Sequence, residues 1–291
     1  MLFANTHLHS TFSDGVWTPE ELIRLGKKIG HKAMILTDHD TVRGTYFFQK
    51  EARKHGLLTM IGAEFNCGTS FGRCHIVGID FNPENAAMKE LMAIGSNRQT
   101  NRSRFLFEEG LERGSLRPGI TWEDVVKAYP DNDYLCNNQV FELMLQQGIY
   151  TKEEYQEFFQ NNFRSTPESR KRFGNDSVTL EETVSTIRAA GGVAVLAHPG
   201  AKDRYMDHSC FDEILKAGVN GVEIRHPLMT AEERALYDRL CDEHGLYKLG
   251  GIDHDGLLGG YAEAMPAHDV APEEGYLDEA NFMKLYRREL G

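Results

Sequence analysis

The 291-residue sequence has few cysteines, and none of them stands in a paired arrangement. Its five cysteines are an odd number, and no two are separated by only two residues. This pattern argues against a disulfide framework and is typical of reduced thiols. The N-terminus also lacks a basic segment followed by an apolar run, and no apolar stretch is long enough to cross a bilayer. We therefore expect a cytoplasmic protein without a membrane partner.

An excess of basic residues is also lacking. The 32 lysines and arginines are outnumbered by 44 aspartates and glutamates, which gives a net charge of −12. Because phosphate backbones are held by basic patches, nucleic acid is not expected as a partner beyond mono- or short oligonucleotides. Nothing resembles a P-loop, a dinucleotide-binding glycine pattern or a Ser-His-Asp triad. The sequence leaves the oligomeric state open.

Strand and helix patterns alternate in the first and last thirds of the chain. The sequence patterns Thr18-Pro19-Glu20-Glu21, Thr179-Leu180-Glu181-Glu182 and Thr230-Ala231-Glu232-Glu233 are capping boxes that predict three helix starts. Further helices are expected at residues 45–55, 211–216 and 278–290. Strands are predicted at residues 2–6, 33–37, 57–62, 74–79, 193–197, 221–224 and 247–252. Such alternation indicates a parallel sheet with right-handed crossovers, and seven units favour a closed or nearly closed barrel.

Residues 81–178 interrupt this rhythm. The segment is rich in Asn, Gln, Arg and Glu, and the spacing of Phe105, Leu106 and Leu111 is helical, as is that of Val140 and Met144. We interpret it as a helical insertion that covers the mouth of the barrel as a substrate lid, because loops at that face carry function. The predicted organisation is barrel at 1–80, insertion at 81–178, and the rest of the barrel with a C-terminal tail at 179–291.

The seven apolar runs each end at, or carry, a histidine or an acidic residue. Side chains that converge from the ends of parallel strands build the active site of a barrel. His7 and His9 are two residues apart, so at a strand end they point to the same side. Imidazoles and carboxylates without thiols favour a cluster of divalent metals. The candidate ligands are His7, His9, Asp14, His39, Glu64, His75, His198, Asp253 and Asp255.

Several candidates also have an ordinary structural interpretation. Asp14 precedes Gly15 and fits a turn, and His75 alone in mid-strand is more often a hydrogen-bonded core histidine. The neighbouring Asp40 is better explained as a helix N-cap than as a ligand. Glu64 differs, because a carboxylate at the end of a buried strand needs a partner. A bridging metal is favoured there over a buried salt bridge.

Seven ordered motifs resemble those of the PHP (polymerase and histidinol phosphatase) superfamily, and above all its stand-alone metal-dependent phosphoesterases. These motifs, in chain order, are HLHSTFSDG, LTDHDT, GAEF, CHIVGI, LAHPG, GVEIRHP and GIDHDG. The resemblance covers the chain up to about residue 80 and from 179 to about 256. It implies an α/β fold, namely a distorted (β/α)7 barrel with a helical insertion. It also implies two or three divalent ions of Mn, Fe or Zn.

Carried over position by position, the resemblance implies three overlapping ligand sets. The third set consists of Asp14, His39 and Asp255; Asp255 stands where histidine is usual, and His254 is the alternative for that position. Relatives with this kind of insertion also carry an Arg-Pro-His segment that grips the substrate phosphate, and the corresponding stretch here reads Asn137-Asn138-Gln139. The three sets are His7, His9, Glu64 and Asp253; Glu64, His75 and His198; and Asp14, His39 and Asp255.

The expected activity is that of a metal-dependent phosphoric ester hydrolase. Two bridging cations offset the charge of the phosphate and lower the pKa of a bound water from ~15.7 to about 7, which gives hydroxide at neutral pH. We expect His226 to protonate the leaving group and Arg225 to bind phosphate oxygens. A turn residue before the next helix is the alternative for His226. Further phosphate contacts are expected from Arg98, Arg102 and Arg164 of the insertion.

The expected substrate is a small phosphorylated metabolite, first of all a nucleotide or sugar phosphomonoester. A cyclic phosphodiester that is opened and then dephosphorylated is the second candidate. A short-oligonucleotide exonuclease is less favoured because of the charge of −12. The alternative of another class is a non-catalytic, metal-binding PHP module. It is disfavoured because nearly all the ligands implied by the resemblance are present.

Overall fold

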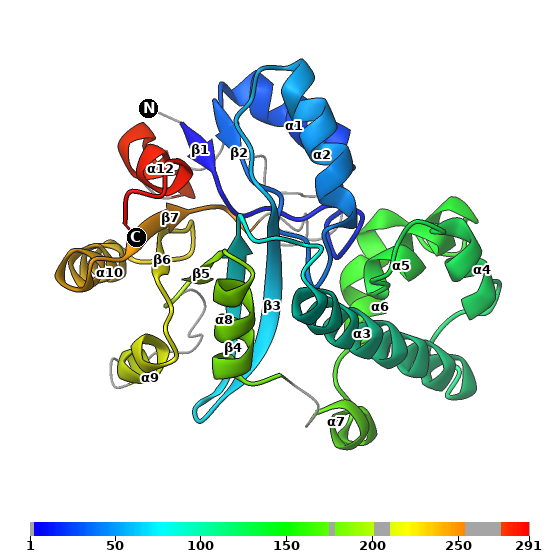
Figure 1. Cartoon of the computed structure of the whole chain (residues 1–291). Helices are drawn as coiled ribbons and strands as arrows, with labels where there is room; N and C mark the ends of the chain where they lie inside the picture. The colour runs from blue at the N-terminus through cyan, green and yellow to red at the C-terminus, as the bar shows by residue number, and fades with distance from the viewer. Residues whose placement is uncertain (1–2, 175–177, 201–209, 254–274, 291) are drawn as a thin grey trace.

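The strands form two sheets in the computed structural model, which describes residues 3–174, 178–200, 210–253 and 275–290 (Figure 1). In the smaller sheet, β1 (Ala4–Asn5) pairs in parallel with β2 (Ala33–Met34). The larger sheet has the order β3-β4-β5-β6-β7. Its strands are β3 (Gly62–Thr69), β4 (Gly72–Ile79), β5 (Val193–Leu196), β6 (Gly221–Arg225) and β7 (Tyr247–Gly250).

The expected parallel, closed barrel is only partly found. In the larger sheet, strand β4 runs antiparallel to both β3 and β5, and the neighbouring pairs β5-β6 and β6-β7 are parallel. The two residues between β3 and β4 allow a hairpin but no crossover, which fixes the antiparallel pairing. The third strand begins at residue 62, so the prediction for residues 57–62 was wrong, and Leu58 makes one isolated bridge with Ala33.

Single contacts connect the two sheets where a closed barrel would have continuous ladders. Thr6 N donates to Gly250 O over 3.0 Å after β1. On the other side, His39 forms an isolated parallel bridge with Glu64 of β3. The described sheets are therefore not closed. The ends of β1, β2, β3 and β7 nevertheless meet in one place.

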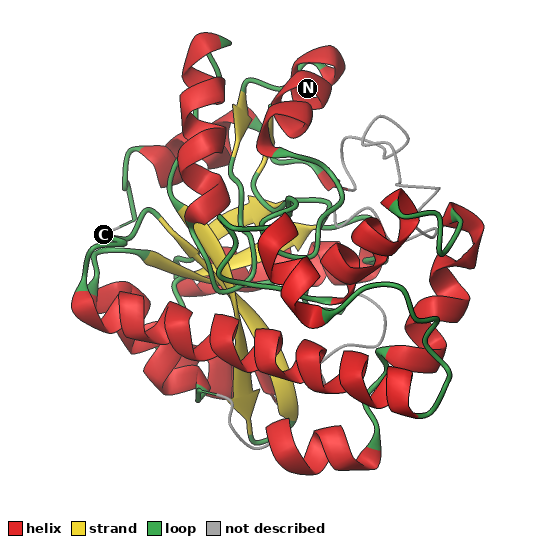
Figure 2. Ribbon diagram, turned by 90° about the vertical axis from the view of Figure 1, so that its right-hand side faces the viewer, coloured by secondary structure: helices red, strands yellow, loops and turns green. Residues whose placement is uncertain are grey.

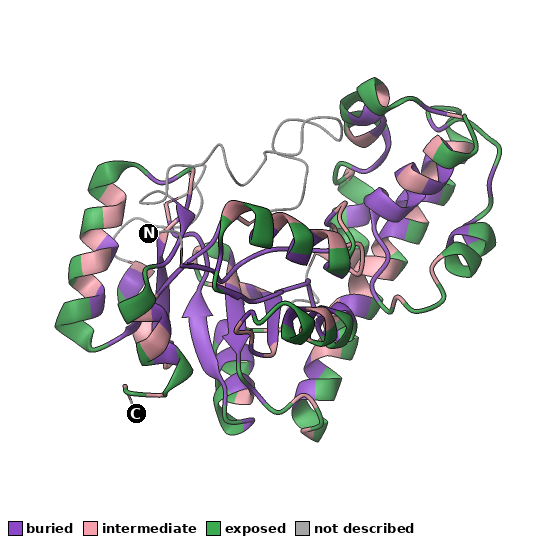
Figure 3. Ribbon diagram, turned by 90° about the horizontal axis from the view of Figure 1, so that it is seen from above, coloured by how far each residue is buried: buried purple, intermediate pink, exposed green. Residues whose placement is uncertain are grey.

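Helices surround the sheets (Figures 2 and 3). They cover one face of the larger sheet, and its other face packs against the smaller sheet and a C-terminal helix. The three predicted capping boxes are confirmed, at Thr18, Thr179 and Thr230. Along β4, Ile76 packs towards the outer helices, whereas Val77 packs into the interior shared by the two sheets. The helices around the sheets are α1 (Pro19–Ile29), α2 (Arg43–Lys54), α8 (Leu180–Ala189), α9 (Phe211–Lys216), α10 (Ala231–His244) and α12 (Glu279–Tyr286).

The regular elements described between β4 and α8 are all helical, as predicted. They lie on one side of the sheets in Figure 1, opposite α9, α10 and α12. They pack around a core of their own that includes Phe107, Phe141 and Phe158. The elements are α3 (Ala86–Glu112), α4 (Trp122–Ala128), α5 (Asn137–Gln146), η1 (Lys152–Glu154), α6 (Tyr155–Asn162) and α7 (Pro167–Phe173).

Helix α3 connects this insertion to the rest of the molecule. Its first half packs Met88 and Leu91 against the larger sheet, and its second half packs Leu106 and Phe107 into the core of the insertion. A division into separate domains at residues 80 and 178 therefore stays a prediction. Among the helices that the structure describes, none has the length and apolar character to cross a membrane.

Candidate metal centre

Glu64 lies at the centre of the cluster of histidines. Its neighbours Ala63 and Phe65 pack towards the outer helices, so the alternation of β3 turns Glu64 into the interior, where it is fully buried. Five imidazoles face its two carboxylate oxygens. Oε2 lies 3.2 Å from His7 Nε2, 3.1 Å from His9 Nε2 and 3.3 Å from His39 Nε2, and Oε1 lies 2.8 Å from His75 Nδ1 and 3.1 Å from His198 Nε2.

The surrounding ligands come from the ends of different strands. His7 and His9 follow β1, and their Nε2 atoms lie 3.6 and 3.2 Å from Asp253 Oδ1, just beyond β7. His39 follows β2. Its Nε2 lies 3.5 Å from Asp14 Oδ2, and His9 Nδ1 lies 3.5 Å from Asp14 Oδ1. The cluster thus joins the two sheets at the place where their strand ends meet.

The backbone is strained at several of these strand ends. Asp40, His198 and Asp253 have φ angles of 52°, 32° and 47°, in a region that non-glycine residues rarely occupy. Such strain costs of order 1–3 kcal/mol per residue and concentrates at functional sites. The turns at His198 and Asp253 direct their side chains into the cluster at the expense of stability.

Three groups of potential metal ligands have their atoms within 4.8 Å of one another. The first is the same as the first predicted set. In the second, His39 joins Glu64 and His75, while His198 contacts the same Glu64 oxygen as His75. The third contains His9 in addition to the predicted Asp14 and His39. Asp255 and its alternative His254 lie outside the described residues.

The chemistry of this donor set fits divalent metal ions. Glu64 Oε2 is fully buried and receives no hydrogen bond from the described residues, although three imidazole nitrogens surround it. A buried carboxylate oxygen without a donor is costly unless a cation compensates it. Imidazole nitrogens mixed with carboxylate oxygens suit Zn, Fe and Mn.

The electrostatics of the cluster favour positive charge. Burial alone would raise the pKa of Glu64, but the imidazoles of His7, His39 and His75 hold that pKa well below its ordinary value. Burial would likewise lower the pKa of His7, yet Glu223 and Glu64 hold it well above its ordinary value. The carboxylates therefore attract cations. Binding of a metal would displace the imidazole protons, as metal binding to such sites requires.

Glu223 of β6 is a contributor that the sequence analysis did not assign. It is fully buried, with Oε1 2.7 Å from His7 Nδ1, and its Oε2 accepts a hydrogen bond of 2.6 Å from His198 N. Because a carboxylate only accepts, His7 carries a proton on Nδ1, and Nε2, which faces Glu64 and Asp253, is the nitrogen that a metal ion would bind in place of a proton. The only sequence signal was an acidic residue inside a buried strand.

Asp40 lies against α3 and does not serve as the predicted helix cap. Asp40 is not the N-cap of α2, whose N-cap residue is Val42. The Asp40 carboxylate presses against α3, where a Cβ on Gly95 would lie 2.2 Å from Asp40 Cγ, so only glycine fits there. Burial raises the pKa of Asp40 to about 8, although the charge of Arg98 opposes the shift. A phosphate contact by Arg98 stays a prediction.

The other candidate arginines also have protein partners or solvent. Arg102 donates to Phe163 O over 3.3 Å and to Ser165 Oγ over 3.0 Å, which ties α3 to the segment after α6. Arg164 is exposed. Arg225 Nη1 donates to Ile224 O over 2.9 Å at the end of β6. Their roles in substrate binding stay predictions.

His226 is buried directly after β6, with an exposed fraction of 1%. Its Nδ1 accepts a hydrogen bond of 3.2 Å from Leu228 N, so the ring proton resides on Nε2. That Nε2 lies 3.9 Å from Asp253 Oδ2, at the edge of the metal cluster. The backbone of the next turn thus orients the ring so that its N–H points towards the site.

Comparison with known proteins identifies the family. The model of the PHP domain matches residues 5–170, more than half of the chain. This chain belongs to the PHP domain family. The fold resembles that of solved structures, among them one described as a metal-dependent phosphoesterase from Bifidobacterium adolescentis, with a TM-score of 0.76 and 23% identity over 98% of this chain and 96% of that one. An amidohydrolase from Chromobacterium violaceum has a TM-score of 0.72 and 23% identity over the same shares.

Curated relatives of this PHP protein hydrolyse several kinds of phosphate ester. A 3',5'-nucleoside bisphosphate phosphatase from Chromobacterium violaceum is 26% identical, over 91% of this chain and 92% of the relative. A phosphoribosyl 1,2-cyclic phosphate 1,2-diphosphodiesterase from Eggerthella lenta is 24% identical, over 89% and 96%. The 5'-3' exoribonuclease Rnm of Escherichia coli is 26% identical, over 85% and 83%. All three names denote enzymes that hydrolyse phosphate esters, but the substrates that they name differ.

Proposed function

We propose that this phosphoester hydrolase of the PHP family removes the phosphate of a small phosphorylated metabolite, a nucleotide or sugar phosphomonoester, with the help of two or three divalent metal ions. The observation that carries the proposal is the environment of Glu64. Each of its two oxygens faces a different group of imidazoles, at 2.8–3.3 Å. A carboxylate placed in this way is suited to bridge two cations.

The ligands for these ions would come from the three overlapping sets. One ion would be held by His7, His9, Glu64 and Asp253, and a second by Glu64, His75 and His198, with His39 in reach of the same carboxylate. Asp14 and His39 would hold a third ion together with Asp255. When bound, such ions offset the charge of the phosphate and activate water at neutral pH by lowering its pKa. Mn, Fe or Zn would satisfy this donor set.

His226 would supply the proton for the leaving group. A departing alkoxide is a strong base, so its release is accelerated by a positioned acid. The hydrogen bond from Leu228 N fixes the His226 ring with Nε2 3.9 Å from Asp253 Oδ2. To deliver a proton from Nε2 the ring must first become an imidazolium, in which Nδ1 is protonated as well and gives up the hydrogen bond from Leu228 N. Arg225, two residues after the buried Glu223, would bind phosphate oxygens through its guanidinium.

A cyclic phosphodiesterase that works in two steps is the second candidate. The specific observation that favours it is the overlap of three ligand groups, because His9, His39 and Glu64 each belong to two of them. Three adjacent ions would serve first the opening of a diester and then the hydrolysis of the resulting monoester. The relative from Eggerthella lenta, named as a cyclic phosphate diphosphodiesterase, supports this alternative.

A substrate screen of the Mn-loaded protein tests the proposal. Sugar phosphates, mononucleotides, cyclic phosphates and short oligoribonucleotides are each incubated with the enzyme, and released phosphate and products are followed. We expect phosphomonoesters to give the highest kcat/KM. Preference for a cyclic phosphate or an oligonucleotide would replace the proposed substrate. Absence of turnover with all of them would support the non-catalytic alternative.

The metal content is measured on the same preparation. After purification without chelator and with Mn supplied, elemental analysis should find at least two ions per chain. Fewer than one ion per chain would contradict a multinuclear centre, whatever the outcome of the substrate screen. The two measurements therefore separate a wrong substrate from a wrong metal assignment.

A further inference from the structure

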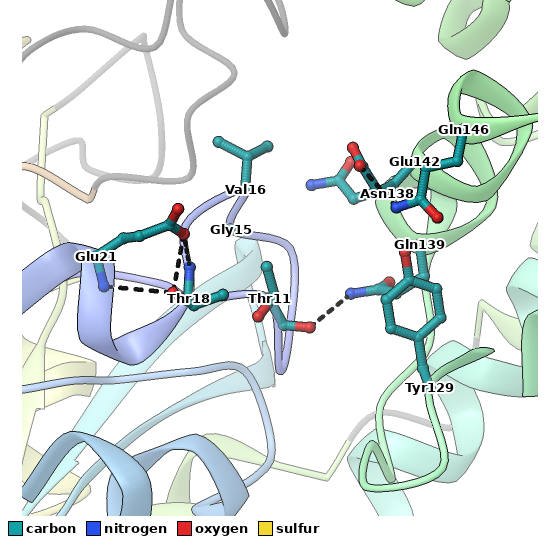
Figure 4. A pocket seen from close by; sticks show the side chains of 10 residues that line it. All are labelled: Thr11, Gly15, Val16, Thr18, Glu21, Tyr129, Asn138, Gln139, Glu142 and Gln146. Atoms are coloured by element: carbon teal, nitrogen blue, oxygen red, sulfur yellow. Dashed lines mark hydrogen bonds between the residues drawn. The ribbon is translucent and has the colours of Figure 1, made fainter. Parts of the chain in front are cut away.

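Amide side chains of the insertion contact the loop that carries Asp14. Gln139 Nε2, at the start of α5, donates to Thr11 O over 3.1 Å, as Figure 4 shows, and to Ser13 O over 2.5 Å. Asn138 Nδ2 donates to Asp14 O, and Asn132 Nδ2 donates to Thr11 O over 2.8 Å. Three main-chain carbonyls within residues 11–14 are therefore held by the insertion.

The orientation of each amide is determined at its other end. Gln139 Oε1 accepts a hydrogen bond of 2.8 Å from Cys136 N, so Nε2 must be the atom that faces the loop. Asn138 Oδ1 accepts from Tyr155 OH over 2.9 Å and from Asn137 Nδ2 over 2.7 Å. Both amides are buried, with 2% and 3% of their surface exposed. Rotation of either amide would leave buried groups without partners, which costs about 1–3 kcal/mol per group.

The same loop is held from the inside by Asp38, which follows β2. Asp38 Oδ1 accepts from Ser13 Oγ and from Ser10 N, and Oδ2 accepts from Ser10 Oγ, each over 2.7 Å. Gly15 closes the loop, because a Cβ there would lie 2.3 Å from His9 O. Asp14 lies between these two anchors. Its carboxylate is 3.5 Å from both His9 Nδ1 and His39 Nε2, and 27% of the side chain is exposed.

The amide N–H groups that hold the loop are not available for a substrate phosphate. The two N–H groups of the Gln139 amide are used by two carbonyls of the loop, and the Asn138 amide donates to Asp14 O. The stretch that corresponds to the phosphate-gripping Arg-Pro-His segment of relatives thus binds main chain in this protein. Its effect on chemistry must pass through the loop, and the ligand on that loop is Asp14.

We propose that Gln139, supported by Asn138 and Asn132, is a positioning residue that sets the place of Asp14 and thereby the metal affinity of the group formed by His9, Asp14 and His39. This inference rests on the proposed function, since it assumes that the group binds an ion. Partners of this indirect kind typically change metal affinity 10–100-fold. The helical insertion would in this way determine whether the third ion is bound.

The test compares two glutamines on one helix. Gln139→Met removes the donors at nearly constant volume, whereas Gln146→Met changes an exposed glutamine of α5 whose amide bonds only to Glu142 Oε1 among the described residues. Mn binding is titrated in both variants and in the unchanged protein, and hydrolysis of p-nitrophenyl phosphate is followed as Mn is raised. We expect the Mn ion that is bound most weakly to have a Kd about tenfold higher in Gln139→Met than in the unchanged protein. Its activity should return at high Mn, and Gln146→Met should behave like the unchanged protein.

Two outcomes would overturn the inference, namely equal Mn affinities in all three proteins, or a loss of activity in Gln139→Met that excess Mn does not restore. A change that only disturbs packing gives the second result. If thermal unfolding shows that Gln139→Met does not fold, Asn132→Ala decides by the same titration, with a smaller expected shift of about threefold. Hydrolysis by the unchanged protein is scored separately, so a failure of the proposed function is visible without reference to the variants.

Discussion

The two sheets hold their shares of the candidate metal ligands in different ways. Glu64 lies within β3 and His75 lies within β4, so a continuous ladder of backbone hydrogen bonds places both. His198 follows β5, which the same sheet holds, and its N–H donates to Glu223. His7, His9, Asp14 and His39 lie on loops after strands of only two residues. Their loops are held by isolated backbone hydrogen bonds, such as those from Asp253 N to His7 O and from Asp40 N to Glu64 O, and by the side chains of Asp38, Gln139 and Glu223.

We call the part of the site on β3, β4 and β5 the ladder side, and the part on the loops after β1 and β2 the loop side. The difference between them suggests that the ladder side is a rigid scaffold and that the loop side can be adjusted. A ladder position is fixed by many backbone bonds, so substitution of a neighbouring side chain moves it little. A loop held by a few side-chain hydrogen bonds shifts when one of them is removed, since each contributes only about 0.5–1.5 kcal/mol net. We therefore expect the β3–β5 side to tolerate changes outside the ligands. The β1–β2 side should lose metal affinity when residues that bind no metal are changed.

The largest effect is expected from Glu64→Gln on the ladder side. The amide keeps the shape of the side chain but removes the negative charge that faces five imidazoles. We expect kcat/KM for a phosphomonoester to fall about 10⁴-fold or more, which corresponds to roughly 5 kcal/mol of transition-state stabilisation. Elemental analysis should show loss of bound ions.

The matched control is Glu108→Gln on α3, an exposed glutamate paired with Arg104. Exposed pairs of this kind contribute little to stability, so this variant should keep both its metal and its activity. If Glu64→Gln retained most of its activity, Glu64 would not be a bridging ligand. Glu64 would then not be the residue that connects the ladder side with the loop side.

His226→Ala tests the proposed general acid, which directly follows β6 of the larger sheet. Loss of a general acid typically costs 10²–10⁴-fold, mainly in kcat, when the leaving group is a poor one such as a sugar alkoxide. With p-nitrophenyl phosphate the loss should be much smaller, because the phenolate needs little protonation. Steady-state kinetics on the two esters make the comparison. Equal losses on both would show that His226 orients substrate or packs, and does not deliver the proton.

Local signals made part of this structure predictable from sequence. The capping boxes at Thr18 and Thr230 mark helix starts within four residues, and they occur where predicted. Most ligand candidates were also visible, because histidines and acidic residues at the ends of apolar runs stand out by residue type. The strand predicted at residues 57–62 was wrong, because pairing with β4 determines where β3 lies and the apolar run does not.

The supporting residues could not be found in this way, because their partners are distant in the chain. Glu223 contacts His7 across 216 residues, and Gln139 contacts Ser13 across 126. Asp40 was expected to cap α2, but α3 brings Gly95 and Arg98 against its carboxylate. Each of these contacts depends on how the insertion or the last strands return to the N-terminal loops, which no local pattern encodes.

Glu223→Gln should reveal the dependence of the loop side on side chains. An amide has one acceptor oxygen, so it cannot accept from both His7 Nδ1 and His198 N as the carboxylate does. If the amide nitrogen faces His7, the imidazole must carry its proton on Nε2 and cannot bind a metal there. We expect Mn affinity to fall 10–100-fold in a titration. Unchanged affinity would mean that His7 Nε2 is not a ligand.

Removal of the metals should lower the local stability of the loop side more than that of the ladder side. A site filled at 100 times its Kd stabilises the fold by about 2.7 kcal/mol, so chelation should lower the Tm by roughly 5–10 °C. Hydrogen exchange then shows where the stability is lost. Amides of residues 6–15 and 37–41 should exchange much faster without metal, because the ions link loops that have little backbone pairing of their own. Amides of β3, β4 and β5 should stay protected by their ladders. A uniform rise in exchange across both regions would show that the two halves unfold as one unit, and that the ladders do not hold Glu64, His75 and His198 in place without the metal.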